Sequence, residues 1–234
     1  MRLDVWADLV CPWCYIGKRR LERALAEFPH TEDVEMFFRS FQLDPRAPVG
    51  RTRLQVEVLV ERYRTSEARA LALESETART AEAEGLEFRF EGALTGNTFD
   101  AHRLVHLARA RGKEGAVVDR FYRAQFAEQR SLFEKGSLVE LAAEAGLDLS
   151  ESQTVLDQGA YAEAVLADVQ EAVDLGATGV PFFLLDHRYG ISGAQSPAVF
   201  LGALTRSWED THPSTSQPSA GSVPAGPDGQ AQGR

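Results

Sequence analysis

The pattern of apolar and polar positions predicts a strand and then a helix at the start of the chain. Residues 3–9 are apolar-rich and β-prone, which indicates a buried strand. Pro29 ends a following run in which apolar residues recur at helical spacing, at Ile16, Leu21, Ala24, Leu25 and Phe28. A helix is therefore expected to follow the strand closely.

Strand character returns in three further places. Residues 34–43 are rich in aromatic side chains, and residues 180–186 and 189–194 have the pattern of a hairpin. Together with the first helix, the strands at 3–9 and 34–43 form a β-α-β unit whose crossover should be right-handed.

A last helix is expected to begin at Ser196-Pro197, with Ser196 as the cap and Pro197 at the first helical position. Its apolar positions are Phe200, Leu201, Leu204 and Trp208. Beyond Asp210 the chain consists largely of Pro, Ser, Gly, Gln and Ala, a composition that cannot bury enough apolar surface to order itself. We expect a disordered tail there.

Between about residue 54 and about residue 175 the apolar spacing is helical throughout. Five apolar faces are marked by Leu54, Val58, Leu59 and Tyr63; by Phe99, Leu104, Leu107 and Ala108; by Val117, Phe121, Tyr122, Gln125 and Phe126; by Leu138, Leu141 and Ala142; and by Val165, Val169 and Val173. Helix ends are expected at four glycines, Gly85, Gly112, Gly146 and Gly159.

This order of elements predicts one mixed sheet with a helical block inserted into it. A β-α-β start and a β-β-α finish would build the sheet domain from residues 1–50 and 176–209. The inserted all-helical domain would span residues 51–175, and the tail would span residues 210–234.

Composition and charge limit the classes of function. Hydrophobic residues make up 44% and charged residues 26%, as in ordinary globular proteins. The formal net charge of −10 argues against nucleic acids or anionic membranes as main partners, and no apolar run is long enough to span a bilayer. The N-terminus enters the first strand without the pattern of a signal peptide, so we expect a cytoplasmic protein.

The only two cysteines, Cys11 and Cys14, lie where the first strand gives way to the helix. Unpaired backbone N–H groups and the helix dipole favour an anion at that place, so a thiol there ionises more readily. The thiolate is the form that attacks disulfides. Pro12 suits the first helical turn because its missing N–H costs nothing there.

Two other interpretations of the cysteines stay open. They could be buried small hydrophobic side chains, or half of a zinc site, although no second cysteine pair exists to complete four ligands. A two-residue gap at a strand–helix junction favours redox chemistry, and a reducing cytosol favours a transient catalytic disulfide over a permanent one. We therefore expect dithiol chemistry and no metal.

Other polar and aromatic clusters have simpler explanations. His102 and His106 lie four residues apart on a predicted helix, but the remaining metal ligands are missing, so we expect one solvated and one packed histidine. The basic run 18–20 and the acidic run from Glu74 to Glu87 are expected to be solvated. An aromatic cluster should form core, at Phe37, Phe38, Phe41, Phe182 and Phe183.

The elements together resemble a known family. Strand, Cys-x-x-Cys, helix, strand and helical insert are followed by Thr178-Gly179-Val180-Pro181-Phe182-Phe183 and then by Gly190-Ile191-Ser192-Gly193-Ala194-Gln195. From about residue 3 to residue 208 the chain resembles the DsbA-like thioredoxin-fold dithiol oxidoreductases, and more narrowly their FrnE-like branch, first associated with polyketide clusters. The resemblance implies an α/β, thioredoxin-like fold with a mixed sheet and a large inserted helical domain.

The resemblance also assigns roles to individual residues. It implies that Cys11 is the exposed nucleophile and Cys14 the buried resolving thiol. It further implies a cis peptide between Val180 and Pro181 that faces the sulfurs and leaves the Val180 backbone free to pair with an extended substrate.

Four more residues are expected to shape the site. By the same resemblance, Asn97 and His102 lie nearest the thiol cleft, where His102 would tune Cys11 or carry a proton. Pro12 and Trp13 separate the cysteines, whereas DsbA carries Pro and His there. Because an indole cannot supply positive charge, we expect a protein less oxidising than DsbA. Trp13 could instead serve as an apolar landing surface for substrate.

We therefore predict a cytoplasmic thiol–disulfide oxidoreductase acting on proteins or small molecules that contain thiols or disulfides. Whether it is an oxidase, reductase or isomerase is left open, as is a homodimer. No metal or organic cofactor, nucleic acid or membrane is expected, although glutathione or another thiol could be a co-substrate.

Two alternatives come from other classes. One is a glutathione-dependent enzyme related to the kappa-class transferases and 2-hydroxychromene-2-carboxylate isomerase, which typically use a serine near the position of Cys11 and have no resolving thiol. The other is a non-catalytic, chaperone-like protein that binds unfolded chains in its cleft.

Overall fold

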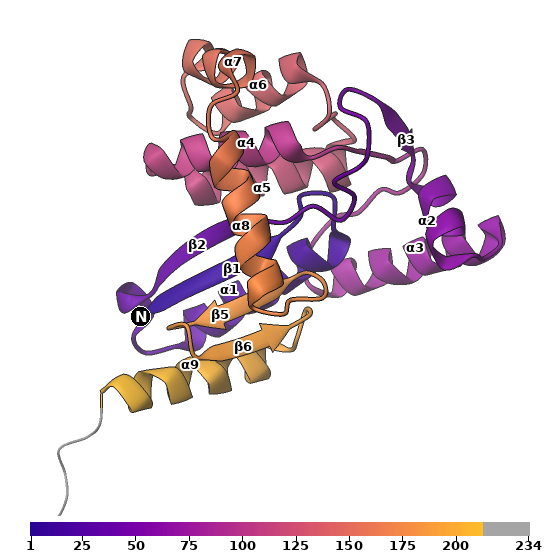
Figure 1. Cartoon of the computed structure of the whole chain (residues 1–234). Coiled ribbons are helices and arrows are strands. Elements are labelled where there is room, and N and C mark those ends of the chain that lie inside the picture. The colour runs from indigo at the N-terminus through magenta and orange to yellow at the C-terminus, as the bar shows by residue number, and fades with distance from the viewer. Residues whose placement is uncertain (213–234) are drawn as a thin grey trace, which may run out of the picture.

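A computed structural model describes residues 1–212 and contains a four-stranded mixed sheet (Figure 1). The strands are β1 (Arg2–Ala7), β2 (Glu35–Ser40), β5 (Phe182–Leu185) and β6 (Tyr189–Ser192), in the order β2-β1-β5-β6. β2 runs parallel to β1, whereas β5 is antiparallel to β1 and β6 is antiparallel to β5. The predicted mixed sheet, with its β-α-β start and β-β-α finish, is confirmed.

Helices make up most of the rest of the described chain. α1 (Pro12–Glu27) joins β1 to β2 by way of a short 3₁₀ turn at Thr31–Asp33, and α9 (Pro197–Thr211) follows β6. Between β2 and β5 lie α2 (Gln55–Tyr63), α3 (Glu67–Ala83), α4 (Phe99–Ala110), α5 (Glu114–Arg123), α6 (Lys135–Glu144), α7 (Leu149–Gln158) and α8 (Ala162–Asp174). The predicted helical block is therefore confirmed. The block is not all-helical as expected, because it contains a short antiparallel pair, β3 (Thr52–Leu54) with β4 (Leu94–Gly96). A π-helical turn at Ala124–Glu128 also lies within it.

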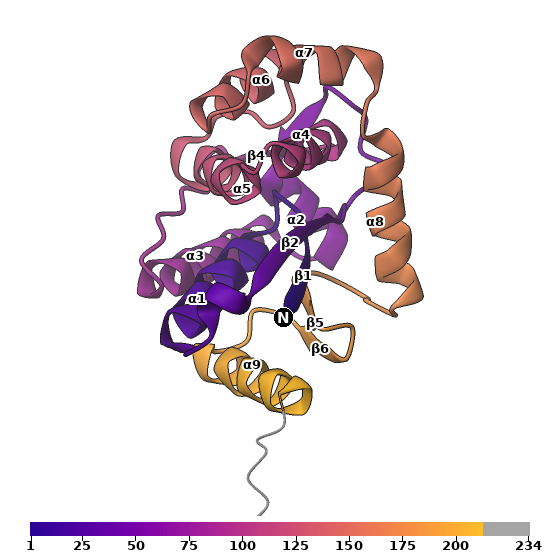
Figure 2. The same ribbon diagram turned by 90° about the vertical axis from the view of Figure 1, so that its left-hand side faces the viewer.

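The two faces of the sheet are covered by different helices (Figure 2). Leu3 and Val5 of β1 point into the main core, which α1 and α9 complete on one face. Trp6 points the other way, packs against Phe182, and donates its indole N–H to the backbone oxygen of Asp168 in α8 at 2.9 Å. Because both faces are covered, β1 is buried almost throughout, as its apolar-rich sequence predicts.

α4 is the central helix of the inserted block, because residues 101–108 are all buried. It contacts α5, α7 and α8 (Figure 2). The aromatic positions predicted for the next helix are buried as well, at Phe121, Tyr122 and Phe126. Their burial fixes the helical block against the start of α1, where Tyr15 stacks on Tyr122 with ring centroids 4.8 Å apart.

The sequence predicts where α3 and α7 end, at Gly85 and Gly159, but it predicts no apolar face for either helix. The buried face of α3 consists of Ala70, Glu74 and Ala81, which leaves no large apolar side chain to reveal the helical period. The expectation that the acidic run from Glu74 is solvated is wrong at Glu74, which is only 5% exposed, although Glu76, Glu82 and Glu87 are exposed.

The burial of several side chains differs from the prediction. Leu54, Tyr63 and Val173 are exposed, although their spacing placed them on apolar faces. α8 turns Asp168 toward the sheet, where the carboxylate accepts a hydrogen bond from the backbone N–H of Ser40 at 2.8 Å. Lys18 was expected to be solvated, but it is buried because its ammonium group pairs with Glu22 and with Asp119.

The predicted helix ends are confirmed, since Gly85, Gly112, Gly146 and Gly159 have the positive φ that favours glycine after a helix. Ser196 and Pro197 begin α9 as expected. α9 continues through Thr211, so the predicted tail begins at least two residues too early, and from 213 onward that prediction lies outside the described residues. The division into a sheet domain and an inserted domain stays a prediction. The two parts are in direct contact, since α8 of the inserted block packs on β2.

Candidate active site

The chain places both cysteines at the beginning of α1. Cys11 is the N-cap residue, with φ −89° and ψ 111°, and Pro12 occupies the first helical turn. The backbone N–H of Cys14 donates to the Cys11 carbonyl at 3.1 Å, which puts the second thiol one turn into the helix. The predicted position at a strand–helix junction is confirmed, and both cysteines are free thiols.

The loop before β5 faces the first thiol. The peptide between Val180 and Pro181 is cis, as the resemblance implies. The Cys11 thiol donates to the backbone oxygen of Val180 with a sulfur–oxygen distance of 3.8 Å. Residues about 170 positions apart in the sequence therefore meet at the reactive sulfur.

Gly17 allows this close approach, and the sequence interpretation missed it. A Cβ atom at residue 17 would lie 3.0 Å from Cγ of Pro181 and 3.2 Å from the ring of Phe183. These separations are shorter than ordinary carbon–carbon contacts. Glycine at this helical position thus lets α1 pack directly on the cis-proline loop.

Both thiols are more buried than expected. Cys14 is 2% exposed, as predicted for a resolving thiol, but Cys11 is only 4% exposed, so the expectation of an exposed nucleophile is wrong for the free protein. The reason is that Val10, Trp13, Leu43 and Val180 surround the same space. Among these residues Trp13 is the exposed one, at 43%.

The surroundings of Cys14 oppose its ionisation. Burial raises the pKa of the Cys14 thiol well above its usual value, and the hydrogen bond with Cys11 raises it further. The Cys14 thiol therefore stays protonated until a reaction at Cys11 changes its surroundings.

Cys11 opens into a cavity of about 690 Å³. Its walls come from the start of α1, the loop after β2, α2, α3, β4 and the cis-proline loop. Apolar and polar side chains both line it, and among the polar ones Gln55 and Glu74 are buried. A reacting molecule could thus reach the Cys11 sulfur from this cavity.

The family follows from a match over nearly the whole described chain. Residues 2–205 match the family described as the DSBA-like thioredoxin domain. The chain belongs to this family. A probable DsbA oxidoreductase from Streptomyces coelicolor is 47% identical, with a TM-score of 0.86, and the match covers 98% of this chain and 97% of that one. The predicted DsbA-like, thioredoxin-like fold is thereby confirmed.

Two more distant structures share the DsbA-like fold. A 2-hydroxychromene-2-carboxylate isomerase is 17% identical with a TM-score of 0.68, and the match covers 92% of this chain and all of the isomerase. The cytosolic disulfide reductase DsbM from Pseudomonas aeruginosa is 20% identical with a TM-score of 0.61, over 88% of this chain and 98% of DsbM. At such low identity these likenesses show the fold alone.

A buried polar group lies behind the thiols of this DsbA-like domain. Asp8 is 1% exposed, and its backbone oxygen accepts from the N–H of Cys11 at 3.1 Å and from the hydroxyl of Tyr122 at 3.3 Å. Nε2 of His102 lies 3.5 Å from Oδ1 of Asp8, and His102 is 3% exposed. The structure thus places His102 against the side chain of Asp8, whose backbone oxygen accepts from Cys11. Asp8 and Tyr122 are neighbours of the thiols that the sequence interpretation missed.

Asn97 does not line the cavity, contrary to the expectation drawn from the resemblance. Its side-chain nitrogen donates to the backbone oxygen of Ala47 at 2.7 Å. Its side-chain oxygen accepts from Gln42 at 3.2 Å and from the backbone N–H of Phe99 at 2.9 Å. Because these bonds use its amide, Asn97 fixes the loop before β3 against the start of α4.

The two histidines of α4 do not share a ligand. His106 is also buried, so the expectation of one solvated histidine is wrong. Its Nε2 lies 3.0 Å from Oδ2 of Asp168 and 3.2 Å from the hydroxyl of Ser40, in a network that joins α4, α8 and β2. Residues 1–212 contain no group of three or more His, Cys, Asp or Glu side chains placed to hold a metal ion.

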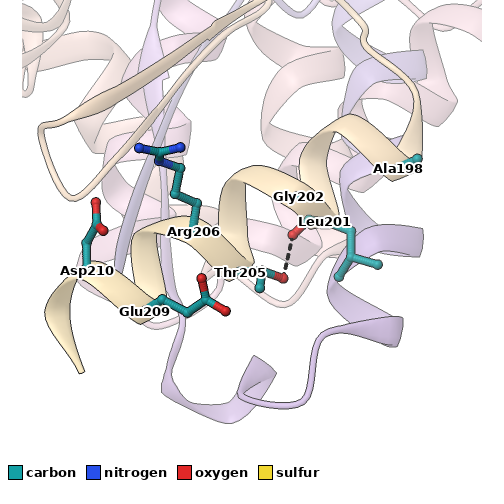
Figure 3. Close-up of a pocket in the computed structure, with 7 residues that line it drawn as sticks. All are labelled: Ala198, Leu201, Gly202, Thr205, Arg206, Glu209 and Asp210. Atoms are coloured by element: carbon teal, nitrogen blue, oxygen red, sulfur yellow. Dashed lines mark hydrogen bonds between the residues drawn. The ribbon is translucent and has the colours of Figure 1, made fainter. Parts of the chain in front are cut away.

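A second hollow lies on the outer surface of α9 and is lined only by residues of that helix (Figure 3). Arg206, Glu209 and Asp210 project from the helix there, and the Thr205 hydroxyl donates to the Leu201 carbonyl at 2.9 Å. No side chain of the thiol site contributes to this hollow, so it is a surface feature.

Among the helices of residues 1–212, none has the length and apolar character needed to cross a membrane.

Proposed function

We propose that this DsbA-like protein is a thiol–disulfide oxidoreductase that cycles Cys11 and Cys14 between a dithiol and a disulfide. One observation carries the proposal: Cys11 is the N-cap of α1, and its sulfur contacts the Val180 oxygen at 3.8 Å and borders a cavity. Cys14 follows one helical turn later, within reach of the same sulfur.

The chemistry has two sulfur-exchange steps. The Cys11 thiolate attacks one sulfur of a substrate disulfide, a new S–S bond forms, and the other substrate sulfur leaves as a thiolate that takes up a proton. The Cys14 thiolate then attacks the Cys11 sulfur and releases the second substrate thiol. Two electrons and two protons pass from the dithiol to the substrate, and the reverse sequence oxidises a substrate dithiol.

The second step requires that Cys14 lose its proton inside the protein. We assign this role to the pair of Asp8 and His102, because the two side chains face each other and the charge of Asp8 acts on the Cys14 thiol. A buried thiol has no direct access to water, so a neighbouring group must accept the proton. His102 thereby acts as a positioning and proton-carrying residue.

Substrate contacts are proposed at Val180 and Trp13. The backbone of Val180 would pair with an extended substrate segment, and the half-exposed indole of Trp13 would pack on its apolar part. Neither contact needs a metal or an organic cofactor, and a small thiol such as glutathione would regenerate the dithiol.

We further propose that the protein belongs to the FrnE-like branch and acts in the cytosol as a reductase or isomerase. The Cys-Pro-Trp-Cys sequence and the resemblance of residues 3–208 support the branch. The cytosol is supported by DsbM, a cytosolic disulfide reductase with this fold. A reducing compartment also favours a catalytic pair of free thiols.

Mass spectrometry after mild oxidation tests the dithiol mechanism. With oxidised glutathione, the reduced protein should lose two hydrogen atoms and retain no glutathione, because Cys14 resolves the mixed disulfide. Stable attachment of one glutathione to wild-type protein would favour the glutathione-dependent isomerase, whose fold this chain shares. Chaperone activity that survives loss of both cysteines, without disulfide turnover, would favour a binding protein.

A pair of cysteine variants separates the two roles. Cys14→Ala should accumulate a mixed disulfide at Cys11, since the resolving thiol is missing. Cys11→Ala is the matched control and should form none under the same conditions. Equal trapping by both variants would contradict the assigned order of attack.

A further inference from the structure

The cavity beside Cys11 extends well beyond the sulfur. Side chains of α2 and α3 form part of its wall, and Figure 1 shows these helices at the end of the sheet where β1 leads into α1. Val58, Leu73 and Phe90 contribute apolar surface to its lining. A volume of about 690 Å³ is typical of a pocket for a small molecule.

Of the three acidic side chains in this wall, Asp44 and Glu76 are exposed to solvent, whereas Glu74 is buried. Glu74 is only 5% exposed, and its Oε1 atom is buried without a hydrogen bond. Burial raises the pKa of this carboxyl group. A buried carboxyl group without a partner is costly, so its place in the wall of a reactive cavity calls for an explanation.

Basic side chains of the protein do not neutralise Glu74. Arg62 and Arg69 also line the cavity, but both are exposed, and neither forms an ion pair with Glu74 in the described chain. Gln55 is a second buried polar residue of the same wall. The buried part of the wall therefore presents an unpaired acidic group and an amide beside apolar side chains, whereas the other charged lining residues are exposed.

We propose that the cavity binds low-molecular-weight disulfides and thiols that carry an ammonium group, with the ammonium at Glu74 and the sulfur at Cys11. This inference rests on the proposed oxidoreductase function and names its substrate class. An ammonium group would donate to the unpartnered carboxylate and make its burial favourable. The apolar walls would enclose the carbon chain between the two ends.

The reaction is the exchange already described. The Cys11 thiolate bonds to one sulfur of the amine-bearing disulfide, the substrate S–S bond breaks, and one aminothiol leaves with a proton. Cys14 then displaces the second aminothiol and closes the Cys11–Cys14 disulfide. The substrate disulfide is the oxidant, so no further electron acceptor is needed.

Single-turnover oxidation of the reduced protein tests the inference. The two probes are cystamine, which carries two ammonium groups, and 2-hydroxyethyl disulfide, which is similar in size and uncharged. Their rate ratio in the wild type is compared with the ratio in Glu74→Gln, so that the intrinsic reactivity of each disulfide cancels. We expect the preference for cystamine to fall roughly tenfold in Glu74→Gln, the size expected for loss of one charge-assisted hydrogen bond.

Two further variants serve as controls. Glu82→Gln removes an exposed charge from the same helix and should keep the wild-type ratio. Glu74→Asp keeps the charge on a shorter side chain and should keep part of the preference. An unchanged ratio in Glu74→Gln would overturn the ammonium site. If oxidised glutathione and both small disulfides leave the wild-type dithiol unoxidised, the proposed function itself fails.

Discussion

Nε2 of His102 faces Oδ1 of Asp8 at 3.5 Å, and neither atom has a hydrogen-bond partner within residues 1–212. The two residues come from different parts of the chain: Asp8 lies just before Cys11, and His102 lies in the buried centre of α4. The charge of Asp8 acts on the Cys14 thiol, so the buried pair that contains this carboxylate is expected to influence the ionisation of the dithiol.

Asp8 and His102 should therefore shift the titration of the dithiol in opposite directions. Burial is the main reason that the pKa of Cys14 is raised, and the negative charge of Asp8 adds to it. Asp8→Asn removes that charge, so the thiolate of Cys14 should form at lower pH. His102→Ala removes the ring nitrogen that faces the Asp8 carboxylate. The carboxylate then acts more strongly on Cys14, so the Cys14 thiolate should form at higher pH.

Ultraviolet absorbance of the thiolates, measured as a function of pH, would follow both shifts. Asp33→Asn and His187→Gln are matched controls, since both side chains are exposed and outside the site, and they should leave the titration unchanged. Shifts in the same direction for Asp8→Asn and His102→Ala would indicate a purely structural role for the pair.

Gly17→Ala should destabilise the protein by about 1–3 kcal/mol, the usual cost of overpacking a close contact. The added Cβ would lie 3.0 Å from Pro181, so the cis-proline loop must move away from α1 and from Cys11. Urea denaturation would measure the loss of stability, and the rate of sulfur exchange should fall with it.

Gly202→Ala provides the comparison within another helix. Nothing lies within 4 Å of a Cβ added at Gly202 in α9. Alanine should therefore stabilise that helix by about 0.5–1 kcal/mol and leave sulfur exchange unaffected. If Gly17→Ala behaved like Gly202→Ala, the tight packing of α1 on Pro181 would not matter for the site.

Glu74→Gln should alter the pH dependence of stability. The pKa of Glu74 is raised by folding, so the folded state binds its proton more tightly than the unfolded state, and stability falls as pH rises through that window. Glutamine does not titrate, so the gain in Tm from this substitution should be larger at about pH 8 than at about pH 5. If the gain in Tm were the same at both pH values, ionisation of Glu74 would not destabilise the folded protein.

Trp13→His should make the protein more oxidising. An imidazole next to Cys11 can carry positive charge that favours the reduced thiolate form, whereas the present indole cannot. Equilibration with glutathione buffers would give both reduction potentials. We expect the wild type to lie below the value of about −120 mV known for DsbA, and a wild-type value that high would contradict the prediction.

The sheet and its flanking helices were predictable because large apolar residues repeat with clear periods there. For α3 and α7 only the ends were predictable, since small or polar residues such as Ala70, Glu74 and Ser152 face the protein interior. The three-residue strands β3 and β4 pair only because distant loops meet, which no local pattern reveals.

The dithiol and the cis-proline could be located from motifs, whereas their buried neighbours could not. The burial of Glu74 and the approach of Asp8 to His102 could not be foreseen, because both depend on tertiary packing rather than on neighbours in the sequence. Asn97 shows the opposite error, since a recurring motif suggested the cavity while its amide holds a loop.

The different surroundings of the three tryptophans give the protein an internal optical reporter. Trp6 is sealed under α8, and Trp208 is sandwiched between His30 and His212, with ring centroids 3.9 and 3.8 Å away. Trp13 alone lines the cavity next to Cys11. Fluorescence changes on oxidation or on filling the cavity should therefore arise mainly from this one indole, so events at the sulfur can be timed without an attached dye.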